Sequence, residues 1–181
     1  MPLSSSITLP VELFPLLNRD QPESQLPPLL PQKPFSPTHK STISTITPNL
    51  PIPIIAILHL LNDDLSSAHT LVQEDDTNID SNLIHSILHR READFWNSKW
   101  WLDQFSHPFL DQLYKQRNLQ GKKGAKQFVD MIQRLTSNKG AITACAAQRD
   151  VNEAKKWQWE EHSSLVQYLF KKYDVAPLAS A

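Results

Sequence analysis

The placement of proline constrains this chain more than any other feature of its 181 residues. Twelve of its 14 prolines lie between Pro2 and Pro53. Each proline fixes its own φ angle and removes a backbone donor, so neither a regular helix nor a central strand is expected there. We therefore predict two parts, a disordered proline-rich arm over residues 1–50 and a helical domain over residues 51–181.

An apolar cluster interrupts the predicted arm, at Val11, Leu13, Phe14, Leu16 and Leu17. Two interpretations stay open for it. The cluster docks on the chain's own domain or on a partner, or it is an apolar patch without a structural role in a flexible segment.

Helical patterns take over at Pro53, which suits the first turn of a buried helix that ends near residue 61. Apolar residues then recur at helical spacing near residues 65–72, 83–88, 94–105, 108–114, 128–135 and 157–170. Residues 121–124 have the composition of a lysine-rich loop, and strand-like alternation of useful length is missing. The pattern predicts an all-α fold, either an irregular helical bundle or an array of αα-hairpins, with no second copy at a fixed period.

Bulk composition excludes several classes of function. Lys and Arg number 18 against 19 Asp and Glu, a net charge of -1, so no basic excess exists to neutralise a phosphate backbone. We therefore expect no nucleic-acid partner. The single cysteine, Cys145, rules out an internal disulfide and any multi-cysteine zinc site, and its alanine neighbours indicate a packed thiol.

The same composition bears on location. The longest apolar run, residues 54–61, contains His59 and is far shorter than the ~20 residues that a bilayer requires. The amino terminus lacks the basic start and apolar stretch of a secretory signal. Together with the lone thiol, these features predict a soluble cytoplasmic protein without a membrane partner.

Two histidines and a glutamate share one face of the helix expected near residues 81–92. His85, His89 and Glu92 are spaced by four and three residues, so they are neighbours on that surface, opposite an aliphatic stripe. Such a set can bind a divalent metal, with His69 or Asp63 from the preceding helix as a further ligand. The alternatives are a solvated face, or histidines hydrogen-bonded between helices.

Arg91 falls in the middle of the aliphatic stripe. If the helix reaches this residue, its guanidinium is buried, and a buried charge requires a carboxylate partner. Asp63, Asp64 and Asp94 are the candidates.

Aromatic residues dominate the next expected helix, and Asn97 stands among them beside Trp100. A buried asparagine must find hydrogen-bond partners, so Asn97 either bridges neighbouring backbone or faces a ligand between aromatic walls. Tryptophans at this spacing are also typical of a packed core.

This region resembles a family of small uncharacterised proteins found in fungi and bacteria. The shared residues are His85, His89-Arg90-Arg91-Glu92, Asp94, Asn97 and Trp100-Trp101. The likeness spans about residues 54–114 and departs after the aromatic pair, where Leu102, Asp103 and Gln104 stand in place of arginines. The resemblance implies that residues 85–101 carry the function, and it implies no particular reaction.

We predict a non-enzymatic binding domain that recognises a protein or a small ligand through a cleft lined by His85, His89, Glu92, Asn97 and Trp100. The alternative is a metal-assisted enzyme whose divalent ion is held by His85, His89 and Glu92 with His69. A purely structural subunit is the third possibility, and the sequence assigns no catalytic residue.

Overall fold

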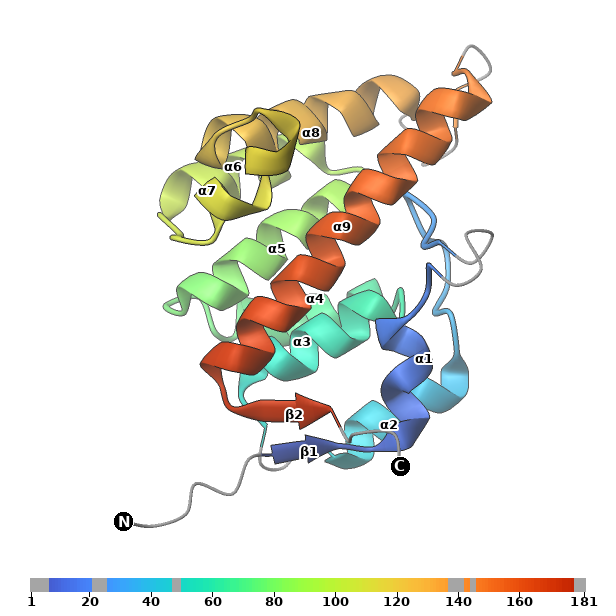
Figure 1. The fold of residues 1–181 in the computed structure, drawn as a ribbon, viewed down its shortest axis with the longest axis vertical. Helices are drawn as coiled ribbons and strands as arrows, with labels where there is room; N and C mark the ends of the chain where they lie inside the picture. The colour runs from blue at the N-terminus through green and yellow to red at the C-terminus, as the bar shows by residue number, and fades with distance from the viewer. Residues whose placement is uncertain (1–6, 21–25, 47–49, 137–141, 144–145, 178–181) are drawn as a thin grey trace.

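A computed structural model describes residues 7–20, 26–46, 50–136, 142–143 and 146–177 of the chain (Figure 1). Cys145, expected as a packed thiol, lies outside this range. The helices of the predicted domain are α3 (Ile52–Leu61), α4 (Leu65–Gln73), α5 (Ile79–Arg91), α6 (Phe95–Gln104), α7 (Leu110–Leu113), the 3-10 turn η4 (Lys115–Arg117), α8 (Gly121–Leu135) and α9 (Gln148–Lys172). The predicted all-α class is confirmed. Among the described residues no helix is long and apolar enough to cross a bilayer.

The long helix α9 runs across the helices α3 and α5, and it contacts α3, α7 and α8 (Figure 1). Its final residues lead into β2 (Val175–Pro177), which pairs in parallel with β1 (Ile7–Leu9) in the register Ile7↔Val175. This short pairing, which the sequence pattern did not predict, ties the two ends of the described chain together.

The lysine-rich loop expected at residues 121–124 is instead the first turn of α8. A side chain at Gly124 would meet the Cβ of Leu119 at 2.9 Å and the Cβ of Tyr114 at 3.0 Å. Gly124 therefore allows close packing of α8 on the preceding turn. The two glycines, Gly121 and Gly124, do not mark the ends of a loop, contrary to the prediction from the sequence pattern.

The hairpins α3–α4 and α5–α6 turn in the same way, with residue numbers that differ by 30. The central residue of each turn is left-handed: Asp63 with φ 56° and Ala93 with φ 63°. The following aspartate amide donates to the carbonyl of a histidine five residues earlier, Asp64 to His59 at 3.0 Å and Asp94 to His89 at 2.8 Å. The chain therefore contains a repeated hairpin that its side-chain pattern did not reveal.

The buried positions of α4 and α6 also correspond, with residue numbers that differ by 30. Ala68 and Ser98 are 0% and 1% exposed, and one turn later Val72 and Leu102 are 0% and 2% exposed. The second helix of each hairpin therefore presents equivalent positions to the core.

The disorder predicted for residues 1–50 is wrong for the described residues of that segment. They form β1, η1 (Val11–Leu13), α1 (Phe14–Leu17) and α2 (Pro37–Ile46). Leu13, Leu16 and Ile43 are fully buried. The prediction of no regular helix in this segment is also wrong, because α2 runs from Pro37 to Ile46 with its proline at the first helical position. Apolar side chains between the prolines still find a core to cover. Leu13 and Leu16 of the apolar cluster thus dock on the chain's own domain, whereas Val11 is 58% exposed.

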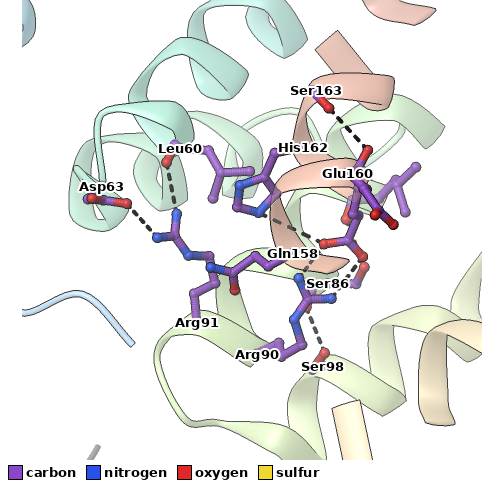
Figure 2. A network of polar contacts seen from close by, with 12 residues as sticks. Leu60, Asp63, Ser86, Arg90, Arg91, Ser98, Gln158, Glu160, His162 and Ser163 are labelled. Atoms are coloured by element: carbon purple, nitrogen blue, oxygen red, sulfur yellow. Dashed lines mark hydrogen bonds and ion pairs between the residues drawn. The ribbon is translucent and has the colours of Figure 1, made fainter. Parts of the chain in front are cut away.

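Arg91 is buried, as predicted, and Asp63 is its carboxylate partner (Figure 2). It also donates to the carbonyl oxygens of Leu60 at 2.9 Å and of Pro28 at 3.2 Å. Arg19 reaches the other oxygen of Asp63 at 2.8 Å. One buried carboxylate therefore joins the N-terminal segment, the α3–α4 turn and the end of α5.

The neighbouring Arg90 points toward α9. Its guanidinium makes a bidentate pair with the buried carboxylate of Glu161, which also accepts a hydrogen bond from the hydroxyl of Tyr114. The two adjacent arginines thus bind different parts of the fold, and they fix the position of the C-terminal end of α5.

A third buried carboxylate, Asp80, joins the start of α5 to the end of α9. His107 donates to it at 2.9 Å, and Lys172 and Tyr173 donate at 2.6 Å each. Burial alone would raise the pKa of Asp80, but these hydrogen bonds outweigh it and lower the pKa to about 2.

Replacing Arg91 tests the importance of the first network. Arg91→Ala should lower the free energy of unfolding by roughly 3–5 kcal/mol, because it leaves the Asp63 carboxylate buried with one partner fewer. Urea unfolding measures this, with the exposed Arg134→Ala as the matched control, for which a change within about 0.5 kcal/mol is expected. A loss below about 1 kcal/mol at Arg91 would contradict the assigned pairing.

Deleting residues 1–50 tests whether the N-terminal segment belongs to the fold. Each buried leucine or isoleucine of the segment contributes roughly 1.5–3 kcal/mol, so the truncated chain should melt at a markedly lower temperature and expose apolar surface to a fluorescent dye. The matched control removes only residues 1–6 and should melt like the full chain. Unchanged melting after the long deletion would show that the segment covers nothing.

Asp80 generates a pH prediction. Because its folded pKa lies below the unfolded value of 3.8, its stabilisation is fully present above pH 3.8 and is lost as the pH falls toward 2. The Asp80→Asn variant should therefore show a shallower loss of unfolding free energy between pH 4 and pH 2 than the parent chain. The exposed Asp76→Asn control should keep the parent slope, and identical slopes for all three proteins would remove Asp80 from the acid response.

Candidate metal centre

Three histidines from two helices meet at the side of α5 that faces α4. His85 and His89 lie one turn apart on α5, and His69 comes from α4. They share a face because residues at i and i+4 are neighbours on a helix. The antiparallel packing of α4 on α5 then brings His69 to them.

The rings form a close group. The Nε2 atoms of His69 and His85 are 3.0 Å apart, and each histidine offers one ring nitrogen within 4.8 Å of the other two. The ring centroids of His69 lie 4.7 Å from His85 and 4.8 Å from His89. His85 and His89 are 3% and 8% exposed, whereas the side chain of His69 is 24% exposed, so the cluster reaches solvent at His69.

Glu92 lies behind the cluster rather than within it. Its carboxylate accepts from Nδ1 of His69, at 2.9 Å and 3.0 Å to its two oxygens, so the Nε2 of His69 is directed at His85. The Nδ1 of His89 lies 3.5 Å from a carboxylate oxygen of Asp94. Glu92, predicted as a ligand with His85, His89 and His69, instead bonds to Nδ1 of His69, because the chain turns at Ala93 and brings Glu92 alongside that ring.

The surroundings shift the pKa values of the cluster in opposite directions. The hydrogen bond that His69 donates to Glu92 raises the pKa of His69. Burial, and then the charges of His69 and His89, lower the pKa of His85 to about 3. Burial also lowers the pKa of His89. His85 and His89 are therefore neutral imidazoles at neutral pH, the form that binds a metal ion.

The spacing suits a small divalent ion. With metal–nitrogen bonds of 2.0–2.1 Å and tetrahedral angles, two ligand nitrogens stand about 3.3 Å apart. The Nε2 atoms of His69 and His85 are already within a few tenths of an ångström of that separation. The third ligand nitrogen, on His89, lies within 4.8 Å of the other two, so it must move closer to them to complete the set.

Trp101 closes the side of the cluster that faces α6. Its ring centroid lies 4.1 Å from that of His85. Trp100 meets Trp101 edge to face at 5.2 Å and is 43% exposed. The aromatic wall predicted at Trp100 is thus formed by its neighbour Trp101, and Trp100 lies at the rim.

Asn97 does not face the histidines. Its backbone amide and its Nδ2 donate to the Asp94 carboxylate at 3.3 Å and 2.6 Å, so it belongs to the N-cap of α6. It meets the cluster through Asp94, which faces His89. Of the five residues predicted to line one cleft, the structure brings His85, His89 and Glu92 together, and places Asn97 and Trp100 around them.

Asp94 and Trp101 are two site residues that the sequence reasoning did not select. For Asp94 a signal existed, because an aspartate follows a histidine by five residues in both hairpins, at His59/Asp64 and His89/Asp94. For Trp101 no pattern distinguished a ring on His85 from ordinary core.

Comparisons of the chain with family models, with curated proteins and with solved structures found no match. The resemblance stated from the sequence therefore stays an expectation.

The position of Glu92 generates a prediction about affinity. Glu92→Gln keeps the shape but weakens the hold on Nδ1 of His69, and such changes behind a ligand typically lower metal affinity about 10–100-fold. Competition titration of Zn²⁺ against a chromophoric chelator measures this. The control Glu74→Gln changes an exposed carboxylate on the far end of α4 and should leave the affinity as it is. Equal affinities for both variants would remove Glu92 from the site.

Proposed function

We propose that this chain is a helical metal-binding domain that holds one divalent transition-metal ion on His69, His85 and His89. The observation that carries the proposal is the convergence of three imidazole nitrogens within 4.8 Å. Imidazole suits zinc and its neighbours among the divalent metals, and a chain with one cysteine cannot offer a thiolate-rich site.

The number of protein ligands favours an ion with one open coordination position over a structural ion that is fully coordinated by the protein. Structural zinc sites take four protein ligands, whereas three protein ligands leave a position for water or substrate. His69 and Glu92 lie at the partly exposed edge of the cluster, so that position would face solvent. A bound ion of this kind lowers the pKa of its water and polarises oxygen groups, which supports the metal-assisted enzyme over a purely structural subunit.

The residues around the ion have separate roles in this proposal. Glu92 orients His69, Asp94 lies behind His89, and Trp101 excludes water from the inner side of His85. Burial favours the neutral form of His85, and a bound ion replaces the proton that lies between the Nε2 atoms of His69 and His85.

The decisive experiment is elemental analysis of the full chain purified without chelator, followed by Zn²⁺ titration. We expect one ion per chain. His85→Ala and His89→Ala should each abolish stoichiometric binding, with a larger loss than Glu92→Gln gives. His39→Ala alters a histidine on α2 and should bind like the parent. Absence of saturable binding in the folded parent, or equal binding by all variants, would overturn the proposal.

One observation favours protein recognition as a second function. Trp96 and Trp100 stand one turn apart on α6 and are 70% and 43% exposed, and exposed tryptophans are enriched where partners bind. If this face binds a protein, Trp96→Ala should weaken capture of that partner while Zn²⁺ affinity stays unchanged. Loss of both together would show that the tryptophans act through the metal site instead.

A further inference from the structure

The equivalence of the two hairpins points to a second binding site, independent of the metal proposal. A groove of about 500 Å³ opens between α2, α3 and α4. The residues that line it are Ser44, Ile55, His59, Ser67, Thr70 and Leu71. A volume of this size lies within the range of small-molecule sites.

The 30-residue correspondence explains why the groove is open. Leu71 corresponds to Trp101, and Ile55 corresponds to His85. In the second hairpin the indole of Trp101 lies against His85 at 4.1 Å and occupies the space between the two helices. In the first hairpin the shorter Leu71 stands at that position, so the described residues leave the equivalent space open.

His59 supplies a directed polar group in this groove. Its side chain is 5% exposed, and its Nδ1 lies 3.0 Å from the carboxylate of Asp64. That contact places the ring proton on Nδ1, so Nε2 is left as an acceptor. Among the described residues, no hydrogen bond is assigned to this Nε2. Burial, opposed by Asp64, lowers the pKa of His59, which keeps the acceptor neutral.

We propose that this groove binds a small planar ring compound that carries one N–H or O–H donor. The ring packs between Ile55 and Leu71, where the second hairpin holds an indole, and the donor bonds to Nε2 of His59. The second hairpin indicates what the occupant looks like. At the position equivalent to Leu71 it carries Trp101, and the indole of Trp101 shows that a planar ring fits between two such helices.

Indole is the probe, and methyl-detected NMR of the full chain is the measurement. We expect saturable shifts at the Ile55 and Leu71 methyls, with intermolecular contacts from indole protons to both. 1-Methylindole, which lacks the donor, should bind about three- to ten-fold more weakly, the value of one hydrogen bond. Equal affinity for both probes would overturn the role of His59.

Leu71→Trp restores the residue type of the second hairpin and should abolish indole binding. Val11→Trp adds the same ring at a position that is 58% exposed and should bind indole like the parent. Undiminished binding by a folded Leu71→Trp variant overturns the site, as do shifts confined to methyl groups outside the groove. If Leu71→Trp does not fold, absence of the methyl contacts in the parent chain also overturns the proposal.

Discussion

The buried carboxylate of Asp63 is the constraint on which the rest of the structure depends. It receives Arg19 from the N-terminal segment and Arg91 from α5, and all three side chains are at least 97% buried. A charge of this kind cannot be left without partners inside a protein, so each group fixes the position of the others. The turn between α3 and α4, the end of α5 and the N-terminal segment are thereby held in one arrangement.

The composition of α5 is unusual for a buried helix. It is buried nearly all round, yet it carries arginines and histidines as well as aliphatic residues. The two arginines bind outward to different elements, Arg91 to Asp63 and Arg90 to Glu161 on α9. This leaves His85 and His89 on the remaining side, against α4 and α6. The ion pairs therefore determine the orientation in which the histidines meet His69.

The two hairpins share one backbone conformation at their turns but carry different side chains beside their histidines. Both turns place a left-handed residue between a histidine and an aspartate, and both pair that histidine with that aspartate, at 3.0 Å for His59 and 3.5 Å for His89. What differs is the filling of the space beside the histidine. Two further imidazoles surround His89, and an indole lies against one of them, His85, whereas short apolar and hydroxyl side chains leave His59 beside a groove.

The sequence by itself determined the helical class, most helix positions, the burial of Arg91 with a carboxylate, and the shared face of His85 and His89. These follow from periodicity, because spacing along a helix fixes which side chains are neighbours. Only the tertiary structure decided that His69 completes the cluster, that Glu92 stands behind it, and that residues of the proline-rich segment cover the core. Each of these depends on a contact between residues far apart in the chain or on a left-handed turn at Ala93, and local spacing encodes neither. The segment's helices α1 and α2 contact α3, so the burial of its leucines depends on where the rest of the fold places α3.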